Sequence, residues 1–208
     1  QEEPSATVEE EARRFFDEGM ADAASGHYAE AALAFETSYN LYPHPGTLKN
    51  LALSQSAAGR PADAYRSWTE LLERFRQVVS DETRAEADRQ MVELDLVLAS
   101  VAFSTNVDGA AILVDRRRLG TAPLSGPLRV APGQHVVEAR LDGYEDVRAS
   151  VLLSQGRNPS VELLLVAREV PPPVLRIETG TAGAMVSIDG GTSESLPLSC
   201  DIEPGLHE

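Results

Sequence analysis

The spacing of apolar residues changes near residue 98, and this change most constrains the fold of the chain. Residues 8–98 carry apolar side chains at the spacing of one helix face, whereas residues 99–208 alternate apolar and polar residues in short runs separated by Gly and Pro. Aromatic residues follow the same division, since nine of the eleven lie before residue 77. We therefore predict a multidomain chain of α then β class, with the helices first.

Signals for helix starts recur along the first part of the chain. Thr7 and Glu10 form a capping box, in which each side chain satisfies a free backbone N–H of the other residue. Pro61 suits a first helical position, and Ser80 precedes acidic residues that suit the N-terminal end of a helix dipole. The predicted helices cover residues 8–25, 29–41, 47–58, 61–76 and 81–98.

The helices repeat with a period of 33 residues. The repeated positions pair Gly26 with Gly59, Ala31 with Ala64, and Phe35 with Trp68. This pattern resembles the tetratricopeptide repeat (TPR), in which Gly makes the turn, a small Ala lets two helices approach and an aromatic ring fills the gap between repeats. The resemblance implies a TPR-like domain over residues 1–98, with two repeats and a capping helix. The second repeat departs from the motif, with Pro61 in place of Tyr and Arg76 in place of the closing Pro.

The second part of the chain is a duplication. The segment "FSTNVDGAAILVD" at 103–115 aligns with "IETGTAGAMVSID" at 177–189, an offset of 74 residues. Farther on, the motif containing Pro132-Gly133 and His135 recurs 72 residues later, as Pro204-Gly205 and His207.

The duplicated pattern resembles the PEGA domain, and the first copy carries its motifs nearly throughout. They are Gly109-Ala110, Val114-Asp115, Pro123-Leu124, Pro132-Gly133, His135 and Gly143-Tyr144. The resemblance implies a complete PEGA-like β-sandwich over residues 99–166 and a partial one over residues 175–208. Residues 135–153 read as two strands joined near Asp142-Gly143, which suits a hairpin turn. The three prolines of residues 167–174 predict an extended, semi-rigid linker between the copies.

The second copy stops at Glu208, before the strands that would match residues 136–166. Our first interpretation is that the sequence continues beyond this point, where a membrane anchor would be one possible extension. The alternative is an assembly subunit, in which a neighbouring chain supplies the missing strands by β-strand complementation.

Charge and composition exclude several classes of protein. The net charge is −15 and both parts of the chain are acidic, which argues against a nucleic-acid partner. No apolar run approaches the length of about 18 residues that a membrane span needs. A lone cysteine, Cys200, offers neither a disulfide framework nor a metal cluster.

Residues with catalytic chemistry are present but do not form a recognisable constellation. His135 and His207 occupy the same place in a repeated motif, which indicates a structural role. His27 lies in a predicted turn and His44 between two prolines, and neither has a second ligand at metal-binding spacing. No nucleophile elbow or phosphate-binding loop is evident. We therefore expect no enzyme activity, no cofactor and no metal.

The two resemblances together imply a non-enzymatic scaffold or adaptor of the bacterial cell envelope, periplasmic or extracellular. TPR-like helices imply a protein or peptide partner on their concave face, and the first helix offers Arg13, Phe16 and Met20 as candidates. The PEGA-like domains would act as spacer or adhesion modules.

A second hypothesis assigns binding to the β part. Arg116, Arg117 and Arg118 form the one basic cluster of the sequence and suit an acidic cell-wall or surface glycan, although a solvated turn is the simpler explanation for them. Aromatic rings, the usual platforms for sugars, are scarce in this part. Retention on an acidic polysaccharide that disappears when the three arginines become Ala would favour this hypothesis.

Overall fold

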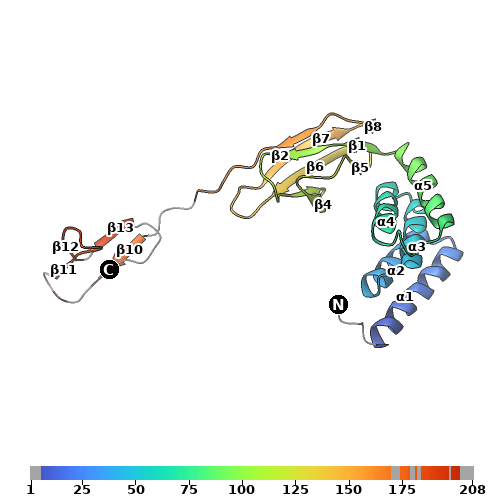
Figure 1. Ribbon diagram of the computed structural model, residues 1–208, viewed down its shortest axis with the longest axis horizontal. Coiled ribbons are helices and arrows are strands. Elements are labelled where there is room, and N and C mark those ends of the chain that lie inside the picture. Colours follow the sequence, from blue (N-terminus) through green and yellow to red (C-terminus); the bar gives the residue numbers. More distant parts are fainter. Residues whose placement is uncertain (1–5, 170–173, 179–180, 182–183, 197, 202–208) are drawn as a thin grey trace. The chain divides into compact units, whose positions relative to one another are not determined.

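The computed structural model describes residues 6–169, 174–178, 181, 184–196 and 198–201. The chain forms two compact units, Gln1–Val166 and Ala167–Glu208. In the first unit helices come first and strands follow (Figure 1), so the predicted α then β order is confirmed. The helices are α1 (Ala6–Ala24), α2 (Tyr28–Leu41), α3 (Pro45–Ala57), α4 (Pro61–Arg74) and α5 (Asp81–Asp95).

The strands are short. Those of the first unit are β1 (Ala99–Val101), β2 (Phe103–Thr105), β3 (Ala111–Val114), β4 (Arg117–Thr121), β5 (Leu128–Val130), β6 (Gly133–Arg140), β7 (Val147–Leu153), β8 (Gly156–Arg157) and β9 (Val161–Leu163). Those of the second unit are β10 (Val174–Ile177), β11 (Met185–Val186), β12 (Glu194–Ser195) and β13 (Leu198–Asp201).

Local chemistry explains where most helices begin. Pro61 is the first residue of α4, as predicted, and the Ser80 hydroxyl accepts a hydrogen bond of 3.2 Å from the N–H of Thr83 at the start of α5. His44 caps α3 with its ring nitrogen Nδ1, which accepts from Gly46 N–H at 3.1 Å. α1 begins at Ala6, two residues before the predicted start.

The same type of turn joins the two helices in each of the hairpins α1–α2 and α3–α4. Gly26 and Gly59 adopt left-handed φ angles of 78° and 72°, which Gly adopts without steric cost. Each ends its helix in a Schellman motif, in which the residue after the Gly donates its N–H to a carbonyl five residues back at 2.9 Å. The 33-residue period therefore corresponds to a structural repeat of α1–α2 and α3–α4.

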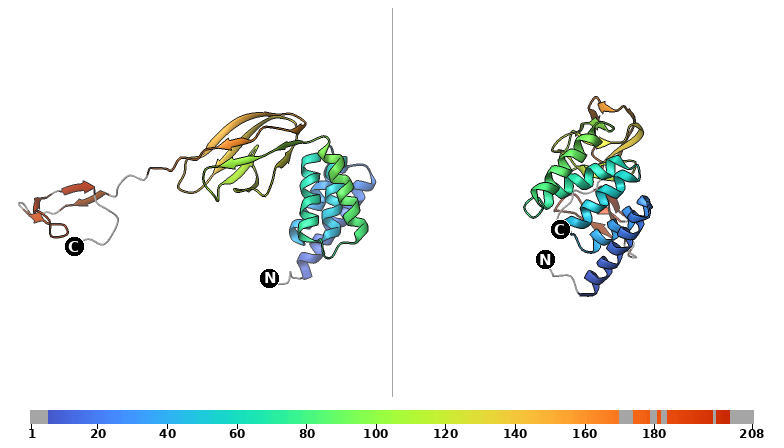
Figure 2. Two further views of the ribbon diagram at one scale, coloured as in Figure 1. Left: turned by 45° about the horizontal axis from the view of Figure 1, so that its top comes forward. Right: turned by 90° about the vertical axis from the view of Figure 1, so that its right-hand side faces the viewer.

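The helical core contains the repeated small and aromatic residues. Ala31 and Ala64 are fully buried, and Phe35 and Trp68 are at most 1% exposed. Consecutive helices pack against one another along the array (Figure 2). Gly19 of α1 lies directly against the Phe35 ring, because a Cβ atom at Gly19 would come within 2.9 Å of its carbons.

The last helix leads into the sandwich with almost no connection. α5 ends at Asp95, three residues before the predicted end, because Leu98 already accepts a sheet-like hydrogen bond of 2.8 Å from the N–H of Gly156. Leu98 belongs to the helical core and Ala99 to the sandwich core, and both are fully buried. Arg129 of β5 reinforces the junction, since it pairs with Asp95 and lies 5.6 Å from the centre of the Tyr65 ring in α4.

Residues 99–165 form a β-sandwich. One layer is an antiparallel sheet in the order β4-β3-β6-β7, and the remaining strands form the ladders β5-β1-β8 and β2-β9. Alternating residues of the larger sheet, such as Ile112 and Val137, meet Val101 and Leu163 in the core. The predicted hairpin is confirmed, because β6 pairs with β7 and Gly143 adopts a left-handed φ of 82° between them.

The second unit repeats the strand register of the first. Met185 pairs with Ser195 as Ala111 pairs with Thr121, 74 residues earlier. The ladders β10–β13 and β1–β5 also correspond, because the pair Val174 and Asp201 takes the place of Ser100 and Arg129 at offsets of 74 and 72 residues. The predicted motif positions Pro204-Gly205 and His207, and residues 170–173 of the predicted linker, lie outside the described residues.

A substitution at Gly19 tests the close packing of the first hairpin. Ala favours a helix over Gly by about 1 kcal/mol, but overpacking a core costs about 1–3 kcal/mol. Phe35 also packs edge-to-face on Phe16, with ring centres 5.6 Å apart, and has little space to move. We therefore expect Gly19→Ala to lower the free energy of unfolding in urea by about 1 kcal/mol.

The control is the same substitution in a Phe35→Leu background. There the ring contact is gone, so Gly19→Ala should be neutral or stabilising. A stabilised single variant in the wild-type background would show that the contact does not constrain the hairpin.

Candidate functional site

A hollow opens on the helices where α1 faces the connection between α2 and α3. Its volume is about 420 Å³, within the range of about 300–1,000 Å³ that is usual for ligand sites. The residues around it include Glu9, Arg13 and Phe16 from α1, Tyr42 and His44 from the connection, and Thr47 from α3.

The predicted residues Arg13, Phe16 and Met20 lie along one face of α1, at spacings of three and four residues. Arg13 and Phe16 line the hollow, whereas Met20 does not. Phe16 is held in place by its contact with Phe35, and Arg13 is exposed. Met20 is 47% exposed and accepts a long hydrogen bond of 3.4 Å from the Asn50 amide of α3.

The odd-numbered helices form one layer on this side. The Asn50 contact joins α1 to α3, and an ion pair of 2.5 Å between Lys49 and Glu86 joins α3 to α5. His44, for which the sequence offers no second metal ligand at suitable spacing, is the cap residue of α3, and Pro45 after it is the first residue of that helix. The hollow thus has fixed walls, because a helix cap and a packed aromatic ring position its side chains.

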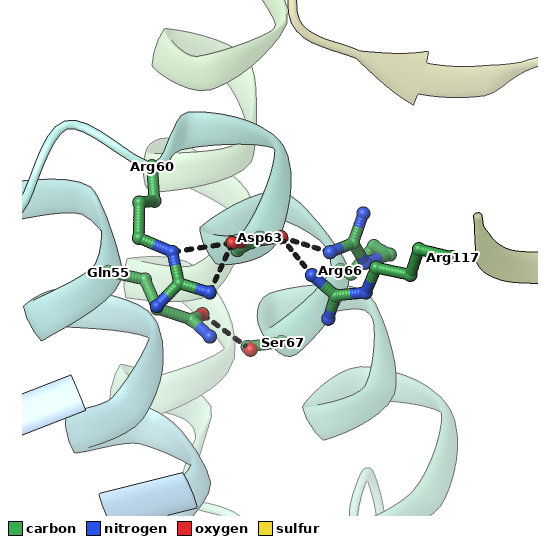
Figure 3. A network of polar contacts seen from close by, with 6 residues as sticks. All are labelled: Gln55, Arg60, Asp63, Arg66, Ser67 and Arg117. Carbon is green, nitrogen blue, oxygen red and sulfur yellow. Dashed lines mark hydrogen bonds and ion pairs between the residues drawn. The ribbon is translucent and has the colours of Figure 1, made fainter. Parts of the chain in front are cut away.

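A second polar site lies where α4 meets β4 (Figure 3). The Asp63 carboxylate pairs with three arginines, which are Arg60 and Arg66 of the helical part and Arg117 of β4. Arg60 donates a hydrogen bond from Nε to Oδ2 at 2.6 Å, and its Nη2 forms an ion pair of 2.6 Å with the same oxygen. Arg117 donates one hydrogen bond to Oδ1 at 2.6 Å. Below this cluster, the Ser67 hydroxyl donates to the buried Gln55 amide oxygen at 2.7 Å.

The cluster holds Asp63 in its charged form. Burial raises the pKa of Asp63, but the positive charges of Arg66, Arg117 and Arg60 outweigh it and keep the pKa below its ordinary value of 3.8. Burial lowers the pKa of Arg66, and the neighbouring charge of Arg117 lowers it further. One carboxylate therefore compensates a local excess of positive charge.

The basic cluster at residues 116–118 does not form one surface. Arg117 is engaged with Asp63, and Arg118 donates to the Thr121 hydroxyl at 2.7 Å. Arg116 lies in the turn between β3 and β4 with a left-handed φ of 68°. The three arginines thus lie in different surroundings, and Arg117 already forms an ion pair with Asp63 of the same chain.

The turn beside Arg116 is fixed by Asp115 and His135. Asp115 accepts a hydrogen bond of 3.0 Å from the Val136 N–H, and its other oxygen lies 2.7 Å from His135 Nδ1. The second ring nitrogen of His135 lies 2.7 Å from the Ala131 carbonyl oxygen. Burial raises the pKa of Asp115, but these hydrogen bonds and the charges of His135 and Arg116 bring it below its ordinary value. His135 therefore connects two loops of the sandwich.

The described residues do not offer a metal centre or a membrane span. No group of three or more His, Cys, Asp or Glu side chains within them is arranged to hold a metal ion. None of the helices among them is both long and apolar enough to cross a bilayer.

Comparison with known protein families finds a match for the sandwich. Residues 98–169 match the family model of the PEGA domain. PEGA domains occur in cell-envelope or extracellular proteins. The match covers the sandwich and confirms the resemblance seen in its motifs, but it does not extend to the helices. No curated protein matches the chain.

Sequence reasoning missed the cluster around Asp63. The spacing of Arg60, Asp63 and Arg66 at three-residue intervals is a local signal for ion pairs on a helix. Arg117 is 54 residues away from Asp63, so no local pattern indicates that it joins them.

The acid dependence of stability tests this cluster. A carboxyl with a lowered pKa stabilises the fold above its unfolded pKa and loses this effect as the pH falls through its folded pKa. We expect Asp63→Asn to cost about 2–3 kcal/mol at neutral pH, below the range for fully buried pairs because the side chain remains 15% exposed. The difference from wild type should shrink below pH 3.8, as measured by urea unfolding across the acid range.

Asp95→Asn is the matched control, because Asp95 also pairs with a sandwich arginine but is 48% exposed. It should change the free energy of unfolding by less than about 1 kcal/mol. Equal losses in the two variants would contradict a special role for Asp63.

Proposed function

We propose that this chain is a non-enzymatic scaffold or adaptor of the cell envelope, whose TPR-like helices bind a protein or peptide segment. The hollow of about 420 Å³ beside α1 carries this proposal. The aromatic ring of Phe16 and the charged side chains of Glu9 and Arg13 line this hollow, a combination that suits an amphipathic peptide.

The regular hairpins support the TPR assignment. The matching Schellman turns at Gly26 and Gly59, and the buried Ala and aromatic residues, recur every 33 residues, which is close to the TPR period of about 34. In such arrays neighbouring hairpins bury a continuous core and leave one face for binding.

The PEGA match supports an envelope location, and the direct fusion of helices to sandwich supports a spacer role for the β part. Since Leu98 and Ala99 are buried in adjoining cores, the sandwich would hold the helices in a fixed orientation.

The roles of the titrating groups support a non-enzymatic function. Burial raises the pKa of Tyr39 to about 12, and its hydrogen bond to Glu70 contributes. A hydrogen bond from Arg140 lowers the pKa of Glu138. These groups, like Asp63 and Asp115, are engaged with neighbouring side chains of the fold.

Peptide selection on the intact chain tests the proposal. Peptides selected from a random library would be measured by calorimetry against wild type and Arg13→Glu. Reversal of a charge in the hollow should weaken binding by at least about tenfold, the effect of losing one charged contact at an interface.

Arg14→Glu is the matched control, because this residue is also exposed on α1 but does not line the hollow. It should leave the affinity within about twofold of wild type. Equal losses in both variants, or selected peptides that bind unchanged to Arg13→Glu, would contradict the hollow as the binding site.

A further inference from the structure

A separate cleft lies between the first turn of α4 and the β3–β4 hairpin. Its volume is about 330 Å³, which suits a small ligand. Both parts of the first unit line it, and it shares no lining residue with the hollow beside α1. Arg60, Arg66 and Arg117 contribute its polar side, and Val114, Leu119 and Val130 contribute apolar side chains.

The cleft holds more positive than negative charge. Asp63 offers two oxygens to three guanidinium groups, and both oxygens are in use. Arg66 and Arg117 each donate one hydrogen bond, to the same Oδ1 atom, although a guanidinium carries five N–H donors. Within the described part of the chain, their other donors have no acceptor.

The second carboxylate of the cleft does not correct this imbalance. Asp115 is engaged by the His135 ring and by the N–H of Val136. The N-terminal end of α4 adds to the positive potential, since its cap residue Arg60 makes no side-chain cap. In a chain of net charge −15, this concentration of positive groups is unusual.

We infer that this cleft binds a carboxylate that carries a short apolar substituent, as a peptide C-terminus or a small organic acid does. The free N–H groups of Arg66 and Arg117 present planar forks, which match a carboxylate. The apolar side chains of Val114, Leu119 and Val130 then provide a surface for the substituent, which a bare inorganic anion lacks.

Binding here would join the two parts of the first unit. Arg66 belongs to α4 and Arg117 to β4, so a carboxylate between them would repeat the bridge that Asp63 already makes. A ligand that binds the folded state raises the unfolding temperature as its concentration rises. Thermal unfolding therefore offers a readout independent of any activity.

The test compares two probes of nearly the same size and shape, of which one carries a carboxylate and the other a neutral amide. N-acetylvaline has a free carboxylate beside an isopropyl group, and N-acetylvalinamide has the neutral amide in its place. We expect N-acetylvaline to bind saturably by calorimetry and to raise the unfolding temperature, and the amide to do neither. Equal behaviour of the two probes would overturn the inference, as would binding of inorganic phosphate in preference to N-acetylvaline.

Three arginine variants locate the site. Arg66→Gln and Arg117→Gln should each weaken N-acetylvaline binding by at least about tenfold, because each removes a charged fork. Arg118→Gln is the control, since its side chain bonds Thr121 and does not line the cleft. Equal loss in Arg118→Gln would overturn the inference. Arg117 is half exposed, so its variant keeps the test valid if Arg66→Gln fails to fold.

Two further measurements are needed. The first tells a peptide terminus from a free organic acid, and the second tells this cleft from the hollow of the proposed function. Isovalerate that binds as well as N-acetylvaline would indicate a free organic acid, and much weaker binding would indicate a peptide terminus. Arg13→Glu, which alters the hollow beside α1, should leave N-acetylvaline binding unchanged. A loss there would overturn the assignment to this cleft.

Discussion

The structure depends on the peptide bond between Leu98 and Ala99, because it joins two hydrophobic cores without a linker. Each residue is fully buried, one among helices and the other among strands. The helical array therefore ends against the sandwich, and its last helix has no freedom to pivot about a flexible segment. The Asp63 cluster and Arg129 act on a junction that burial has already fixed.

Features of the fold that repeat or alternate were predictable from the sequence. Gly26 and Gly59 indicated the same turn because only Gly adopts their left-handed conformation without steric cost. The offset of 74 residues predicted matching strands, and the registers at Ala111 and Met185 agree. The end of α5 was placed too late, because the residues before Leu98 keep helical spacing and only the sandwich determines where the helix stops.

The candidate sites were less predictable, since they depend on contacts between distant residues. Arg13, Phe16 and Met20 share a helix face by spacing alone, but the hollow also needs Tyr42 and His44, which the α2–α3 connection brings close. The run at residues 116–118 indicated a basic surface. In the structure, however, successive strand residues point in different directions. Arg117 donates a hydrogen bond to Asp63 of α4, a contact that no local sequence pattern reveals.

The fusion at Leu98 also gives the helical array a direction. A stack of repeats normally exposes two apolar ends, and each needs a polar cap. Here the chain passes from Leu98 in the helical core directly to Ala99 in the sandwich core, so no further hairpin can follow α5 in the sequence. Related chains could then gain or lose hairpins only before α5, where neighbouring repeats offer equivalent surfaces. Such changes in length would leave the junction between α5 and the sandwich unchanged.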